Sequence, residues 1–91
     1  MHEIIAAKLP EIDDLCRTLG VRRLDVFGSA VDMLVEFDVR PGFDYFGSYF
    51  ALKEGLERIF NRPVDLLSGA SIRNPYFRQN VMDTKEQLYA A

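Results

Sequence analysis

The stretch VRRLDVFGSAVDMLVEF, residues 21–37, decides the fold that this sequence predicts. Along residues 31–37 successive side chains alternate between two faces, and this period of two residues is typical of a β-strand. Residues 21–28 form a second run rich in β-branched and other apolar residues, and it ends in a glycine. Gly28 and Ser29, between the two runs, are typical of a tight turn. The residues alone therefore predict two antiparallel strands joined by a hairpin.

Helical patterns flank this stretch on both sides. Before it, apolar residues recur at steps of four and three up to Leu19, which predicts a helix that Gly20 ends and that Pro10 kinks or restarts. The further elements expected are a helix over residues 44–61, a strand over 63–67 and a last helix over 74–88. The order helix, strand, strand, helix, strand, helix predicts an α+β fold, an α/β sandwich whose small mixed three-stranded sheet is flanked by helices.

Length and composition restrict the class of protein. The 91 residues suit a single domain over residues 1–91, and 48% apolar with 27% charged residues is typical of a folded protein. A net charge of −3 disfavours direct nucleic-acid binding. One cysteine excludes an internal disulfide and a cysteine-rich zinc site. The sequence has no secretory leader and no apolar run of membrane-spanning length, so we expect a cytoplasmic protein without a membrane contact.

Three carboxylates occupy unusual places. Asp32 opens an apolar strand, Glu36 lies on the same face four residues later, and Asp65 interrupts the apolar run PVDLL. Strand interiors disfavour aspartate, and a carboxylate inside a buried strand needs a hydrogen bond or a cation. On neighbouring strands, Asp32 and Asp65 would reach one magnesium ion, which prefers carboxylate and phosphate oxygens. The alternative is that each carboxylate is solvated at the end of its strand.

The segments RRLDVFGSA, VDMLVEF and RPVDLL resemble the minimal nucleotidyltransferases of the DNA polymerase β superfamily. The resemblance extends through SIRNPYFRQN and covers nearly the whole chain. In that family a Gly-Ser pair binds the triphosphate, and magnesium is held by a D-x-D motif and by an aspartate of a later strand. The resemblance therefore implies that Gly28 and Ser29 bind the nucleotide. It implies that Asp32 and Asp65 are the catalytic and metal-binding carboxylates, and that Asp65 activates the acceptor hydroxyl.

The chain departs from the family pattern between the two strands. Only two residues separate Ser29 from Asp32, so the first aspartate of D-x-D falls at Ala30, and the basic residue usual after Gly-Ser is absent. Two explanations are open. Either the loop is absent and the metal site is incomplete, or the protein carries further residues between Ala30 and Val31 that restore the motif. The interpretation as an enzyme depends on this loop.

The resemblance also implies an activity and a partner. It implies magnesium-dependent transfer of a nucleoside monophosphate, AMP from ATP, to a hydroxyl group. Members of the family are commonly paired with an all-helical HEPN protein as toxin and antitoxin, so a hydroxyl of such a partner is an expected acceptor. The alternative is a catalytically inactive binding module that masks its partner. The aromatic residues over 43–50 exceed what one helix face buries, so they are either core or a surface for a partner or a second copy of the chain.

Overall fold

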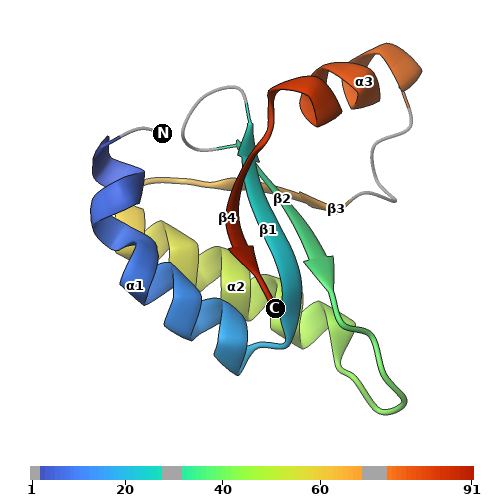
Figure 1. Cartoon of the computed structure of the whole chain (residues 1–91). Coiled ribbons are helices and arrows are strands. Elements are labelled where there is room, and N and C mark those ends of the chain that lie inside the picture. The colour runs from blue at the N-terminus through green and yellow to red at the C-terminus, as the bar shows by residue number, and fades with distance from the viewer. Residues whose placement is uncertain (1–2, 28–31, 69–73) are drawn as a thin grey trace.

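The computed structural model describes residues 3–27, 32–68 and 74–91. In Figure 1, α1 and α2 run beside each other along one side of a sheet, and α3 lies apart from them. The elements are α1 (Glu3–Thr18), β1 (Val21–Phe27), β2 (Asp32–Phe37), α2 (Tyr45–Phe60), β3 (Asp65–Ser68), α3 (Pro75–Thr84) and β4 (Glu86–Ala90). In the described part of the chain, no helix is long and apolar enough to cross a membrane.

The strands form one mixed sheet in the order β3–β2–β1–β4. β1 pairs antiparallel with both β2 and β4, whereas β2 and β3 are parallel. The antiparallel pairing of β1 with β2 confirms the two strands predicted on either side of the Gly-Ser turn. The predicted fold class, an α+β sandwich with a small mixed sheet, is also confirmed, but the sheet has four strands instead of three.

The additional strand comes from the C-terminal segment, where the prediction was wrong. The last helix begins as predicted, with Asn74 accepting hydrogen bonds from the N–H groups of Tyr76 and Phe77. It ends at Thr84 and not at residue 88, and β4 follows it. Tyr89 of β4 is buried and pairs with Leu24 of β1. Because glutamate, glutamine and leucine favour helices, the strand results from pairing with β1 and not from local preference.

The sheet buries apolar side chains on both faces. Met33 and Val35 of β2 belong to the larger core, which also includes buried residues of α1 and α2. Leu34, between them, belongs to a smaller cluster with Phe27 of β1 and Val81 of α3. The alternation predicted for β2 is therefore present, and each of its two faces packs against a different part of the chain.

α1 is a single helix that runs through Pro10, so of the kink or restart predicted at this proline, the restart does not occur. Cys16, on its apolar face, is fully buried in the larger core, as expected. Burial, and to a smaller extent the nearby charge of Asp13, raises the pKa of the Cys16 thiol to about 12. This cysteine is therefore a protonated core residue at neutral pH and takes no part in chemistry.

α2 agrees with the helix predicted over residues 44–61 to within one residue at each end. Asp44 caps the first turn by accepting a hydrogen bond from the N–H of Gly47, and Asn61 ends the helix in the left-handed conformation at φ 54°. The helix approaches α1 closely at Gly55, where a Cβ atom would lie 2.6 Å from a methyl group of Leu15. This contact fixes α2 against α1 and so fixes the helix that borders the site described next.

Candidate active site

Asp32 and Asp65 are neighbours at one end of the sheet. Each is the first residue of its strand, and the two are direct register partners in the parallel pairing of β2 with β3. Neighbouring strands lie about 4.8 Å apart, so the two carboxylates extend from adjacent backbone positions. Asp32 is half-buried and Asp65 is exposed. The prediction that neighbouring strands bring these two residues together is confirmed.

A pocket of about 410 Å³ opens beside this pair. It combines apolar and aromatic walls with two carboxylates and one ammonium group, a composition typical of sites for small ligands. The lining residues come from all but two of the elements and are Phe27, Asp32, Tyr49, Lys53, Asp65, Leu66, Leu67 and Phe77.

Two hydrogen bonds from α2 hold β3 on either side of Asp65. The hydroxyl of Tyr49 donates to the backbone carbonyl of Leu66, with an O···O distance of 2.5 Å. The backbone N–H of Val64 donates to Oε2 of Glu57, at 3.0 Å. Since Asp65 lies between Val64 and Leu66, its backbone position is fixed by the helix as well as by the sheet.

Lys53 lies on α2 between the two residues that make these bonds. Its ammonium nitrogen donates to Oε2 of Glu57 at 3.1 Å, and its side chain is 34% exposed. Two hydrogen bonds hold the pKa of Glu57 below its ordinary value. The bond from the N–H of Val64 has the larger effect, and the bond from the ammonium group of Lys53 has the smaller one. Glu57 is therefore ionised at neutral pH, and it fixes Lys53 at the wall of the pocket.

The other candidate site residues from the sequence are Glu36, Gly28 and Ser29. Glu36 is exposed, and its carboxylate lies 3.7 Å from the guanidinium of Arg22, so it is a solvated residue of the sheet surface. The predictions for Gly28, Ser29 and the junction before Val31 lie outside the described residues.

The described residues contain a pair of carboxylates at the pocket and not a larger group. Within residues 3–27, 32–68 and 74–91, no set of three or more His, Cys, Asp or Glu side chains is arranged to hold a metal ion. Asp32 and Asp65 are therefore a pair of carboxylates and not part of a larger group of this kind in these ranges.

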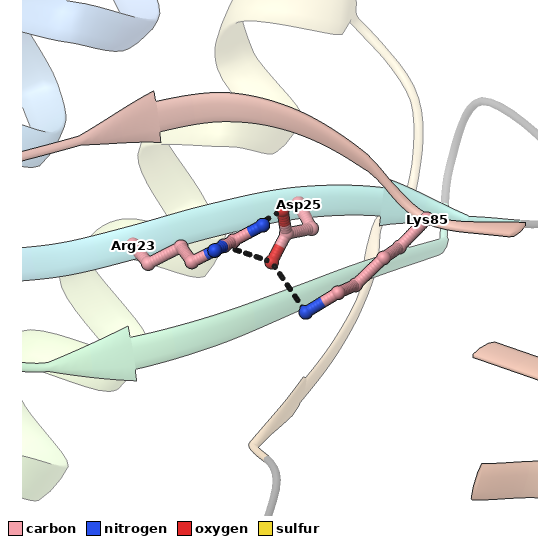
Figure 2. Close-up of polar contacts among 3 residues, drawn as sticks. All are labelled: Arg23, Asp25 and Lys85. Atoms are coloured by element: carbon pink, nitrogen blue, oxygen red, sulfur yellow. Dashed lines mark hydrogen bonds and ion pairs between the residues drawn. The ribbon is translucent and has the colours of Figure 1, made fainter. Parts of the chain in front are cut away.

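Asp25 is a buried carboxylate that the sequence analysis did not select. It lies within β1 and is only 2% exposed. The Nε–H of Arg23 donates toward both of its carboxylate oxygens, at 3.1 and 3.0 Å, and the Nζ of Lys85 lies 3.7 Å from one of them (Figure 2). The aspartate in the strand RRLDVF, with an arginine two residues before it, was a visible signal. Lys85 was not, because it reaches Asp25 only through the unexpected strand β4.

Comparisons with solved structures show the same fold. A candidate minimal nucleotidyltransferase superposes with a TM-score of 0.72 at 26% identity, and the match covers 92% of both chains. A chain of the tri-AMPylated Shewanella oneidensis HEPN toxin in complex with MNT antitoxin gives a TM-score of 0.68 at 21% identity, over 96% of this chain and 73% of that one. A chain of a toxin–antitoxin complex with AMP-PNP gives a TM-score of 0.65 at 20% identity, and the match covers 91% of this chain and 73% of that one. The fold is therefore nucleotidyltransferase-like.

A sequence comparison supports the same class. Over 53 residues the chain is 40% identical to a candidate protein adenylyltransferase of Methanocaldococcus jannaschii. The match covers 58% of this chain and 52% of the relative, so it spans about half the length of that curated protein. No family model matches the sequence. The predicted resemblance to the minimal nucleotidyltransferases is thereby confirmed.

Proposed function

We propose that this chain, acting through a single domain over residues 1–91, is a magnesium-dependent nucleotidyltransferase that transfers AMP from ATP to a hydroxyl group. The observation that carries the proposal is the register pairing of Asp32 with Asp65 at the mouth of a pocket. The pocket is large enough for part of a nucleotide, and its carboxylates lie on two paired strands of the sheet.

The two carboxylates fit magnesium. This ion takes oxygen ligands and is commonly bound by one or two carboxylates together with substrate phosphates. Two aspartates at adjacent strand positions supply such oxygens, and like charges at this spacing repel each other until a cation lies between them. Bound magnesium supplies charge stabilisation for the phosphate oxygens and for the leaving pyrophosphate.

The transfer needs a base at the acceptor. In the proposed reaction the acceptor oxygen attacks the α-phosphorus of ATP, the bond to the bridging oxygen of pyrophosphate breaks, and the hydroxyl proton goes to a carboxylate. Asp65 is the exposed member of the pair and accepts that proton, whereas half-buried Asp32 serves as a metal ligand. Gly28 and Ser29 are proposed to bind the triphosphate.

The proposed acceptor is a hydroxyl, such as that of a tyrosine, on a HEPN-type partner protein. Support comes from two similar structures, one an AMPylated HEPN toxin with its MNT antitoxin and the other a toxin–antitoxin complex with AMP-PNP. Two exposed aromatic residues of α2, Phe46 and Phe50, offer a surface for that partner or for a second copy of the chain. Both proteins are proposed to act in the cytoplasm.

The test measures ATP binding and AMP transfer in the same preparation. We expect ATP to bind only with magnesium, and label from α-phosphate-labelled ATP to appear on the partner. Asp32→Asn and Asp65→Asn should each lower transfer by about 100-fold or more. Glu36→Gln, an acidic residue on the same sheet but away from the pocket, is the matched control and should leave transfer unchanged.

The same experiment distinguishes the proposed enzyme from the alternative, an inactive binding module, which the comparisons do not favour. That alternative predicts that the partner binds equally well to both aspartate variants and without magnesium, and that no label is transferred. Absence of magnesium-dependent ATP binding together with such partner binding would overturn the proposed activity.

The 91-residue sequence has no residue between Ala30 and Val31, so the proposed metal site consists of Asp32 and Asp65 without the first aspartate of the family's D-x-D motif.

A further inference from the structure

We propose that Lys53 of α2 binds the phosphate oxygens of the nucleotide in the pocket of Asp32 and Asp65. This inference rests on the proposed function, because it requires a triphosphate in that pocket. Lys53 would then supply, from α2, the positive charge that the family usually places after Gly-Ser and that this sequence lacks there.

The position of Lys53 follows from the helix period. Tyr49, Lys53 and Glu57 are spaced by four residues, so they share one face of α2. The outer two of these residues hold β3 through the backbone of Leu66 and Val64. Lys53 therefore lies beside the part of β3 that contains Asp65, and both side chains line the same pocket.

The charges of the pocket favour a phosphate ligand for Lys53. Among the described residues that line it, two carry negative charge and Lys53 carries the positive charge. A triphosphate entering beside Asp32 and Asp65 meets repulsion from both carboxylates, and magnesium offsets only part of it. The ammonium group of Lys53, which lines the same pocket from α2, supplies an attraction for the phosphates that the carboxylates cannot.

The ammonium group has donors available for this role. A lysine ammonium has three N–H donors, and Glu57 accepts from it at 3.1 Å. Ionised Glu57 is itself fixed by the N–H of Val64, so it orients Lys53 without using all of its donors. A hydrogen bond between a lysine and a phosphate is charge-assisted and stronger than a neutral one.

The experiment compares ligands that differ in phosphate number. Magnesium-loaded wild-type protein, Lys53→Met and Lys53→Arg are titrated calorimetrically with ATP, AMP, adenosine and inorganic tripolyphosphate. We expect Lys53→Met to weaken ATP and tripolyphosphate binding about 10- to 100-fold while changing adenosine binding little, since a hydrogen bond to a charged group is lost. Lys53→Arg should keep part of the affinity because it keeps the charge.

The matched control is Lys8→Met on α1. Lys8 also forms an ion pair within its helix, with Glu11 at 3.6 Å, but it is not among the residues that line the pocket. This variant should bind all four ligands like the wild type. Circular dichroism checks that each variant is folded. Side-chain NMR of the Lys53 ammonium in the wild-type protein, with and without tripolyphosphate, gives a readout that needs no substitution.

The outcomes separate this inference from the proposed function. If wild-type protein binds ATP and Lys53→Met binds it equally well, or the Lys53 signal does not respond to tripolyphosphate, then Lys53 only supports Glu57 and the inference is wrong while the function stands. Equal weakening of ATP and adenosine would also contradict it, because that indicates a structural role. If wild-type protein binds no ATP with magnesium, both proposals fail.

Discussion

Asp25 in the middle of β1 and the Asp32–Asp65 pair at the start of β2 and β3 belong to the same small sheet, yet different groups lie beside them. The register partners of Asp25 are Leu34 and Gln87, and its charge is met by Arg23 and Lys85 from its own chain. The register partners of Asp32 are Phe27 and a second carboxylate, that of Asp65, and both aspartates line a pocket.

The difference separates a structural carboxylate from a candidate functional pair. A buried charge that its own chain neutralises contributes to folding, and removing it leaves cations without a partner. Two carboxylates that are register partners and line the same pocket are placed to share one ligand. Burial alone would have selected Asp25 as the functional residue, whereas register and the pocket select Asp32 and Asp65. Three predictions test this comparison, from the largest expected effect to the smallest.

Replacing Asp25 should cost the most stability. Asp25→Asn removes an acceptor of charge-assisted hydrogen bonds, so we expect the free energy of unfolding to fall by about 1.5–3 kcal/mol. The loss stays below that of a fully enclosed pair because the Arg23 side chain is 40% exposed and can reach water. Urea unfolding measures the change. Glu36→Gln, which affects an exposed ion pair of the same sheet, should change stability by less than about 0.5 kcal/mol. Equal effects of the two substitutions would contradict the structural role of Asp25.

Glu57 should make stability depend on pH. Its pKa in the folded protein lies below the ordinary value of 4.5, mainly because the N–H of Val64 donates to it and also because Lys53 does. A carboxyl with a lowered folded pKa contributes stability that is complete above its unfolded pKa and is lost as the pH falls through the folded pKa. The stability difference between wild-type protein and Glu57→Gln should therefore be constant near neutral pH and shrink below pH 4.5. Unfolding curves over this range measure it, and a difference that grows in acid would contradict the assignment.

Replacing Asp65 should have the smallest effect on the free energy of unfolding, and it should raise this free energy instead of lowering it. In the presence of a chelator, Asp65→Asn removes repulsion between register partners and should raise the free energy of unfolding by about 0.2–1 kcal/mol. Magnesium should then stabilise wild-type protein and have little effect on this variant, because a ligand stabilises only the state that binds it. Thermal unfolding with and without magnesium measures both effects. A destabilised Asp65→Asn variant would show that Asp65 has a structural role like that of Asp25.

Much of the fold could be predicted from the sequence because it depends on neighbouring residues. Helical spacing predicted α2 to within one residue at each end, and Asn74, where the last helix was predicted to begin, is the N-cap of α3. The alternation in β2 and the aspartate within PVDLL identified Asp32 and Asp65 as candidates, since each feature lies within one strand, whereas their pairing depends on two strands that are distant in the sequence. The roles of Gly28 and Ser29 stay predictions.

The sequence by itself determined most of the local elements and identified the two aspartates as candidates, because periodicity, capping and turn residues act over a few positions. Only the tertiary structure decided that residues 86–90 form a strand, since pairing with β1 outweighs their helical preference. It also decided that Lys85 neutralises Asp25, and that α2 holds β3 through a hydrogen bond between residues 17 positions apart. Such contacts join residues distant in the chain, and their energy depends on the packing of the whole sheet and not on any local pattern.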